Sequence, residues 1–181
     1  MVRFEDASQF EALEVNLAKY TSRIKRLRDG IEDGEFTRYN KKSGYRMMSK
    51  VATFSPDYRL LDDIVVDEGN LEATCIVNFG AISAGGTFAA HPGFVDAITQ
   101  IGSFTVNTQE AMDLDVNVFV THGWSGLQVY EELKMDRKYE LYVQMVPDGP
   151  DFYRGDTIVL EGGKLIAFFK EVIVSSTSVV L

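Results

Sequence analysis

The sequence has little of what secreted or membrane-spanning proteins need. Its 181 residues include a single cysteine, Cys75, which excludes an internal disulfide framework and favours a reducing compartment. No stretch approaches the roughly 18 uninterrupted apolar residues of a membrane-spanning helix. The first residues, Met-Val-Arg-Phe-Glu-Asp, lack the apolar core of a secretion signal. We therefore expect a cytoplasmic protein that does not enter a membrane.

Positive charge is also scarce over most of the chain. The net charge is −9, which argues against nucleic acid as a partner. Residues 1–50 carry 11 Lys and Arg against 8 Asp and Glu, a net charge of +3, so residues 51–181 carry −12. The basic cluster of the first segment either attracts an acidic partner or forms the solvated side of helices. It comprises Arg23, Lys25, Arg26, Arg28, Arg38, Lys41, Lys42, Arg46 and Lys50.

There is enough apolar sequence for one folded domain with an added helical segment. Hydrophobic residues make up 45% of the chain and aromatic residues 12%, which supports a packed core. An N-terminal helix is predicted from apolar residues spaced three and four apart: Phe10, Leu13, Leu17, Tyr20, Ile24, Leu27 and Ile31. This seam is too short to establish a coiled coil, and packing against the chain's own core is the alternative. A second, weaker helix is predicted near residues 36–53.

From residue 58 the pattern changes to β-strands. Two predicted strands precede a central helix and five follow it, over Leu60–Asp67, Leu71–Phe79, Val116–Thr121, Leu127–Leu133, Tyr139–Val146, Thr157–Leu160 and Leu165–Val174. Gly162-Gly163 predicts a tight hairpin between the last two strands. An antiparallel sheet wrapped around one central helix, the hot-dog fold of the α+β class, satisfies this order. We predict an N-terminal helical segment over residues 1–55 and a single hot-dog domain over residues 56–181.

The central helix is predicted over residues 92–107 and carries the candidate chemistry. His91 precedes a proline and is biased to extended geometry, and Pro92 suits the first helical position. Four polar residues fall at offsets of four, three and four and share one face: Asp96, Gln100, Ser103 and Asn107. A lone carboxylic acid in apolar surroundings resists ionisation, which suits it to exchange a proton near neutral pH. The alternative is the solvated face of an ordinary amphipathic helix.

The chain resembles a known family in five motifs. Two of them are the helix motif His91-Pro-Gly-Phe-Val-Asp-Ala-Ile-Thr-Gln-Ile-Gly-Ser-Phe-Thr-Val-Asn107 and the later Phe119-Val-Thr-His-Gly-Trp124. The others are Tyr139-Glu-Leu-Tyr-Val, Gly155-Asp-Thr-Ile-Val-Leu and the upstream Tyr45-Arg-Met-Met…Tyr58-Arg. Over residues 36–174 they resemble the product template domains of fungal non-reducing polyketide synthases, specifically their carboxy-terminal hot-dog half. The His-Pro…Asp…Gln form is also similar to the second half of polyketide and fatty-acid dehydratase domains.

The resemblance implies a mechanism and a set of site residues. In that family two hot-dog folds enclose a channel for a carrier-bound poly-β-keto chain. A histidine of the first fold removes an α-proton, and the aspartate that Asp96 matches is its acid/base partner. Aldol closure and loss of water then give an aromatic ring. We accordingly predict catalytic roles for Asp96 and His91, no metal, no cofactor, and substrate contacts from Phe94, Gln100, Ser103 and Asn107.

Two features depart from the family pattern. The first hot-dog fold, which supplies the catalytic histidine, has no counterpart in this sequence, and the tail over residues 174–181 lacks the usual closing Pro-Arg pair. His122 is expected to be structural, whereas His91 either caps the loop or faces Asp96 of its own or a neighbouring subunit. Because a single hot-dog fold leaves a sheet edge exposed, we predict a homodimer with Asp96 near the interface.

Three functions remain open at this point. The leading one is a stand-alone cyclase or dehydratase acting on a polyketide intermediate presented by an acyl carrier protein, with an isomerising or pericyclic activity as a variant. The second is a non-catalytic hot-dog module that binds a polyketide or a synthase, which the missing first fold and the altered tail favour. The third is a hot-dog acyl thioesterase. It ranks lower because the chain has no acyl-CoA recognition motif.

Overall fold

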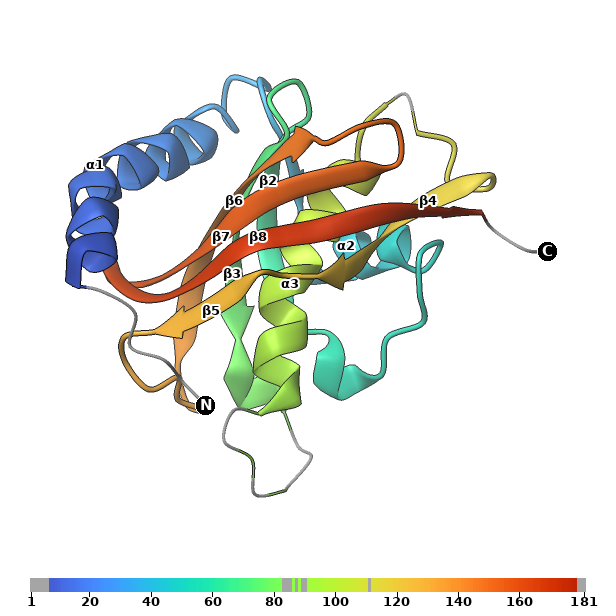
Figure 1. Ribbon diagram of the computed structural model, residues 1–181. Helices are drawn as coiled ribbons and strands as arrows, with labels where there is room; N and C mark the ends of the chain where they lie inside the picture. Colours follow the sequence, from blue (N-terminus) through green and yellow to red (C-terminus); the bar gives the residue numbers. More distant parts are fainter. Residues whose placement is uncertain (1–6, 83–85, 87, 89–90, 111, 179–181) are drawn as a thin grey trace.

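An eight-stranded antiparallel sheet is the largest element of the described chain, and it curls around one helix (Figure 1). The computed structural model describes residues 7–82, 86, 88, 91–110 and 112–178. The strand order is β1-β2-β3-β6-β7-β8-β4, with β5 also paired to β8. The strands are β1 (Thr37–Tyr39), β2 (Leu61–Asp67), β3 (Glu72–Asn78), β4 (Asn117–Gly123), β5 (Gly126–Val129), β6 (Lys138–Pro147), β7 (Phe152–Glu161) and β8 (Lys164–Ser178). The helices are α1 (Ala7–Asp29), α2 (Lys41–Met48), α3 (Pro92–Asn107) and the short 3₁₀ turns η1 (Pro56–Tyr58) and η2 (Phe79–Ala81).

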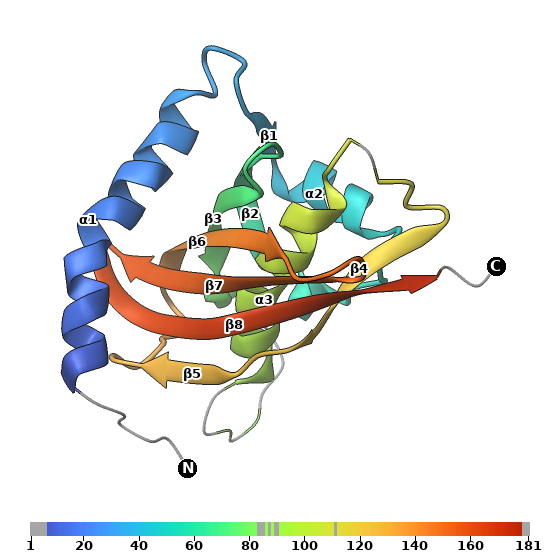
Figure 2. The ribbon, with the colours of Figure 1, turned by 45° about the horizontal axis from the view of Figure 1, so that its top comes forward.

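Helix α3 lies in the concave side of the sheet and forms the centre of the main core (Figure 2). Its apolar residues Ile98, Ile101 and Phe104 are fully buried. Alternate residues of β6, such as Leu141 and Val143, belong to the same cluster, as the two-residue period of a strand requires. Burying side chains of this size contributes about 1.5 to 3 kcal/mol each. The predicted sheet around one central helix is therefore confirmed. Helix α3 also begins and ends at the residues predicted from the sequence.

Helix α1 lies on the opposite, convex face of the sheet, where it covers a second apolar cluster (Figure 2). Ile24 and Leu27 are buried there together with Tyr142 and Phe168 of the sheet. The predicted apolar seam thus packs against the chain's own core, which was one of the two alternatives. Phe10 and Leu13 of that seam lie outside the described side chains.

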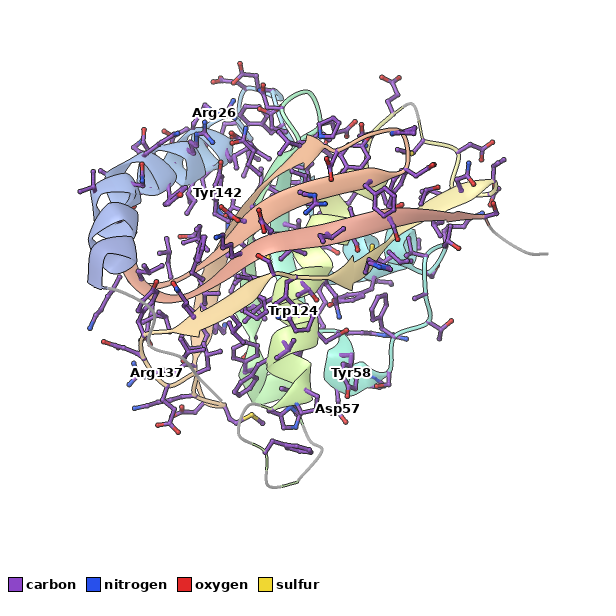
Figure 3. All side chains as sticks on the ribbon, viewed as in Figure 1. Arg26, Asp57, Tyr58, Trp124, Arg137 and Tyr142 are labelled. Atoms are coloured by element: carbon purple, nitrogen blue, oxygen red, sulfur yellow. The ribbon has the colours of Figure 1, made fainter. Side chains whose placement is uncertain are left out.

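Ion pairs fasten α1 to the sheet. Arg26 contacts both Asp67 and Glu72, at 2.7 and 2.8 Å, and Arg28 contacts Asp63 at 2.7 Å. Figure 3 shows Arg26 on α1 and Tyr142 on the sheet beside it. Further pairs join Arg23 to Glu72, Arg38 to Asp63, Lys25 to Asp29 and Lys50 to Asp115. Most of the basic cluster is therefore neutralised within the chain, and it is not simply a solvated helix surface.

The helix predicted near residues 36–53 is wrong in its first part. Residues Thr37–Tyr39 form the edge strand β1, paired with β2, and α2 covers only Lys41–Met48. Asn40 separates the two elements because its side chain accepts a hydrogen bond from the Ser43 N–H at 2.9 Å and so caps the helix. Residues 37–48 thus share the sheet and core of the rest of the chain. The predicted boundary between the N-terminal helical segment and the hot-dog domain, between residues 55 and 56, stays a prediction.

Two strand boundaries also differ from the prediction. The strand expected over Leu127–Leu133 ends at Val129, because the N–H groups of Tyr130 and Glu131 both donate to the carbonyl of Ile166 and the regular ladder stops. The strand expected over Thr157–Leu160 runs over Phe152–Glu161. Its early residues alternate in burial, but the inward position at 155 is a glycine, so the sequence there shows no apolar alternation.

The predicted hairpin at Gly162-Gly163 is confirmed, with positive φ angles of 58° and 84° that favour glycine. None of the helices in the described part of the chain is long and apolar enough to cross a membrane. Among the same residues, no group of three or more His, Cys, Asp or Glu side chains could hold a metal ion.

Candidate active site

The start of α3 is fixed by its cap. His91 has extended backbone geometry, and its Nδ1 accepts a hydrogen bond from the Gly93 N–H at 3.1 Å. Pro92 occupies the first helical position, where its missing N–H costs nothing. A Cβ at Gly93 would lie 3.1 Å from both His91 Nδ1 and Ile82 Cδ1, so the close approach of cap and helix favours glycine. The His-Pro-Gly sequence therefore sets the direction in which α3 begins.

This cap restricts what His91 can do. Its Nε2 is buried and has no hydrogen-bond partner among the described residues. Because Nδ1 accepts the Gly93 N–H, we assign the proton of the neutral ring to Nε2. Neither nitrogen is then free to remove a proton. Of the two expectations for His91, the structure shows the capping contact, and no contact with Asp96 is found in the described chain.

Asp96 lies one turn into α3 and is half-buried. Burial raises the pKa of its carboxyl group, and the hydrogen bond from Gln100 opposes that effect. Gln100 Nε2 donates to Asp96 Oδ2, so one oxygen is held by the helix itself, at the offset of four that places both side chains on one face. The pKa remains above the ordinary aspartate value. The carboxyl group is thus suited to hold a proton nearer to neutral pH than a surface aspartate does.

Gln100 is buried and connects Asp96 to the segment before β2. Its Nε2 also donates to the carbonyl of Tyr58 at 2.9 Å, and its Oε1 accepts from the Tyr45 hydroxyl at 2.7 Å. Tyr58 belongs to η1, which Figure 3 shows beside α3. The sequence did not predict this polar role for Tyr45. The only sequence signal was its presence in a motif shared with the family.

The polar stripe of α3 consists of Asp96 and Gln100 in its first half and Ser103 and Asn107 in its second half, and the second half makes different contacts. Asn107 is 2% exposed, and its side chain exchanges two hydrogen bonds with the backbone of Phe119, at 2.9 and 2.7 Å. Its Nδ2 also donates to the carbonyl of Ser103. Ser103 Oγ lies 3.0 Å from Thr121 Oγ1 on the same strand, β4. These two side chains fasten β4 to α3.

The remaining predicted contact residue belongs to the core. Phe94 is 6% exposed, and its ring packs against Phe79 with centroids 4.1 Å apart. The structure therefore brings Asp96 and Gln100 together and gives Phe94, Ser103 and Asn107 partners inside the fold. The alternative of a solvated stripe is wrong, because Gln100, Ser103 and Asn107 are all 4% exposed or less. His122 is exposed at a register shift of β4.

A family model for the polyketide synthase dehydratase N-terminal domain matches residues 32–180. The chain belongs to this dehydratase family. It is 45% identical over 170 residues to norsolorinic acid synthase stcA of Emericella nidulans, covering 93% of this chain and 8% of that protein. It is 36% identical over 172 residues to the non-reducing polyketide synthase pgmA of Aspergillus terreus, covering 95% of this chain and 8% of that protein. The predicted resemblance to fungal non-reducing polyketide synthases is confirmed.

Solved structures support the hot-dog fold of this dehydratase family member. The dehydratase domain from the CurJ module of curacin polyketide synthase superposes with a TM-score of 0.61 at 15% identity, covering 78% of this chain and 50% of that chain. The dehydratase domain of PpsC from Mycobacterium tuberculosis gives a TM-score of 0.56 at 13% identity, covering 78% and 53%. The chain therefore matches about half of each dehydratase domain. Which half it matches stays a prediction, since the motifs indicate the carboxy-terminal half and the family description names the N-terminal domain.

The match covers only a small part of each curated relative. It spans less than a tenth of the length of the curated synthases that it matches. The names of those synthases describe whole multidomain proteins. Their activities and partners are therefore starting points for proposals about this chain.

Proposed function

We propose that this chain is an acid/base domain that acts on a thioester-bound polyketide intermediate, closing a ring or removing water as product template and dehydratase domains do. One observation carries the proposal: a half-buried carboxyl group, Asp96, has a raised pKa, and the described residues engage only one of its oxygens. For the CurK dehydratase, which shares this fold, an aspartate-to-asparagine variant is described as inactive.

The proposed dehydration step uses Asp96 as the acid. A base removes the proton from the α-carbon of a β-hydroxyacyl thioester, and the electron pair forms the α–β double bond. The β-hydroxyl leaves as water with the proton of Asp96. The base's conjugate acid and solvent then return a proton to the carboxylate. Because His91 is committed to the helix cap, we assign the base to a second hot-dog fold, where the family resemblance implies a histidine. In a second copy of this chain, whose His91 forms the same cap, the histidine left for that role is His122.

A second copy of this chain is the companion fold that we propose. The sheet ends in the short edge strand β1 on one side and in β4 and β5 on the other, and these edges carry unpaired backbone groups. Two-fold pairing would use the same edge of both copies. Size-exclusion chromatography with light scattering tests this proposal: we expect twice the chain mass, and a monomer at all concentrations would exclude the homodimer.

The proposed reaction can be tested directly. We expect the chain to convert a β-hydroxyacyl thioester to its enoyl form, or a poly-β-ketoacyl thioester to an aromatic product. Asp96→Asn should lower the turnover at least about 100-fold, because general acid catalysis is lost. The matched control Glu110→Gln makes the same charge change at an exposed site and should keep full activity. Equal turnover by wild type and Asp96→Asn would refute the acid role.

The same assay separates the two alternatives. A thioesterase would release free thiol from the acyl thioester without forming a double bond or ring. A binding module would show no turnover, yet the wild type and the Asp96→Asn variant would bind the polyketide thioester equally well in titration calorimetry. The raised pKa of Asp96 favours the acid/base function over the binding module, because perturbed carboxyl pKa values concentrate at proton-transfer sites.

A further inference from the structure

The orientation of the Gln100 amide decides how Asp96 is held. In the observed orientation Nε2 donates both of its protons, one to Asp96 Oδ2 and one to the Tyr58 carbonyl, and Oε1 accepts from Tyr45. The reversed amide would place Oε1 against two acceptors, the carboxylate and the carbonyl. The hydrogen-bond pattern therefore assigns the amide without ambiguity. Both protons of Nε2 and the oxygen Oε1 have partners in the fold.

The Tyr45 hydroxyl has its own fixed set of partners. It accepts the N–H groups of Leu60 and Leu61, at 2.9 and 3.1 Å, where η1 passes into β2. Its single proton has two possible acceptors, Gln100 Oε1 at 2.7 Å and the Tyr58 carbonyl at 3.2 Å. The shorter contact is to Gln100, and the Tyr58 carbonyl already receives the Gln100 amide. Tyr45 is thus a donor to Gln100 and an acceptor from the backbone.

We propose that Tyr45 is a positioning residue for Asp96: its hydroxyl fixes the Gln100 amide so that Nε2 points at the carboxyl group. The residue acts through Gln100 and does not need to touch the substrate. The inference rests on the proposed function for its catalytic meaning, since a positioned acid matters only if Asp96 transfers a proton. The hydrogen bond between Tyr45 and Gln100 joins α2 to α3, and the two residues are 55 positions apart in the sequence.

The consequence of this contact is electrostatic. An N–H donor favours the ionised carboxyl group, whereas a carbonyl acceptor favours the protonated one. Without the Tyr45 hydroxyl, Oε1 loses its donor and Nε2 is held at Asp96 less firmly. Burial raises the pKa of Tyr45 well above its ordinary value, so its proton stays in place while Asp96 titrates. Titratable groups on the elements next to the first turns of α3 include Asp57 and Tyr58 on η1 and His91 at the cap, and Cys75 of β3 lies close enough to Tyr45 to act on it electrostatically.

The test is a carbon-13 NMR titration of the Asp96 carboxyl group in Tyr45→Phe, with the signal assigned by its loss in Asp96→Asn. We expect the titration midpoint to move to higher pH. The matched control is Tyr139→Phe. Tyr139 is 2% exposed, and its hydroxyl also accepts a backbone N–H, that of Lys134 at 2.8 Å, but it is not connected to Gln100. That variant should lose comparable stability and leave the midpoint unchanged.

A midpoint that stays in place in Tyr45→Phe, or that moves equally in Tyr139→Phe, would overturn the proposal. If Tyr45→Phe does not fold, the test is made on the wild type by following the carbon-13 chemical shift of Tyr45 Cζ against pH. That shift should change with the same midpoint as Asp96, because the Gln100 amide connects the two side chains. A Cζ shift that does not change with pH would refute the connection. None of these readings needs a substrate. An inactive chain that shows the midpoint shift would therefore refute the proposed function and leave the positioning role of Tyr45 intact.

Discussion

The two halves of the α3 polar stripe have the same residue spacing but different contacts and burial. In the first half, Asp96 and Gln100 meet the segment around Tyr45 and Tyr58, and Asp96 stays half-buried with one oxygen engaged. In the second half, Ser103 and Asn107 meet β4 and are buried. The first half holds an acid whose ionisation is resisted. The second half satisfies backbone groups that would otherwise be unpaired inside the core.

This difference shows how a helix face can serve both structure and chemistry. A side chain whose hydrogen bonds all end on buried backbone contributes to stability, because losing it leaves those groups unpaired. A carboxyl group whose pKa is raised by burial makes folding less favourable at neutral pH, and such groups concentrate at functional sites. Four substitutions along the stripe test the division.

The largest expected effect is that of Asn107→Ala. It leaves the N–H and carbonyl of Phe119 without their side-chain partner in the core. We expect the free energy of unfolding to fall by about 3 kcal/mol in urea titrations. The control is Asn117→Ala, at an exposed position on β4, the strand that carries Phe119. It should change stability by less than about 0.5 kcal/mol. Equal effects of the two substitutions would contradict a structural role for Asn107.

Gln100→Ala should have an intermediate effect. The Tyr45 hydroxyl can turn to the Tyr58 carbonyl, 3.2 Å away, so only part of the network is lost. We expect a loss of about 1 to 2 kcal/mol in the same urea titrations. The pKa of Asp96 should also rise, since the opposing hydrogen bond is gone. A larger loss than in Asn107→Ala would show that the first half is the more structural one.

Ser103→Ala should cost less again, about 1 kcal/mol or less. Thr121 Oγ1 keeps an acceptor in the carbonyl of Thr99, at 3.4 Å, after the serine hydroxyl is removed. A double-mutant cycle with Thr121→Val isolates the pair, and we expect a coupling energy that differs from zero. Additive effects would mean that the 3.0 Å contact between the two hydroxyl groups contributes nothing.

Asp96→Asn should have the smallest effect on stability, and in the opposite direction. The pKa of Asp96 is raised in the folded state, so its stabilising contribution is complete below the unfolded-state pKa and is lost as pH rises through the folded-state pKa. Asparagine cannot ionise. The variant should therefore be more stable than wild type at neutral pH, with the difference vanishing in acid, as followed by thermal unfolding across pH. Glu110→Gln should show no such pH-dependent gain.

The sequence predicted the elements whose signals are local. The bounds of α3 follow from Pro92 at its start and from a continuous apolar face, and both are visible without a structure. The carboxyl group at Asp96 and its partner Gln100 follow from the same helical period. The strand β1 was not predicted, because three residues carry too little alternation to be recognised.

The partners of the stripe were not predictable in the same way. Tyr45 reaches Gln100 only because the chain between α2 and β2 brings the carbonyl of Tyr58 and the N–H of Leu60 to the same point. Asn107 is structural because β4 returns beside the end of α3. Both contacts depend on the paths of connecting segments, and side-chain periodicity carries no information about those paths.

The most direct test of the division within α3 is the pKa of Asp96 in the wild-type chain, measured by carbon-13 NMR of its carboxyl group. A partly buried proton-transfer site predicts a pKa above the ordinary value of aspartate. A pKa at or below that value would contradict it, because Asp96 would then be one more polar group used by the fold.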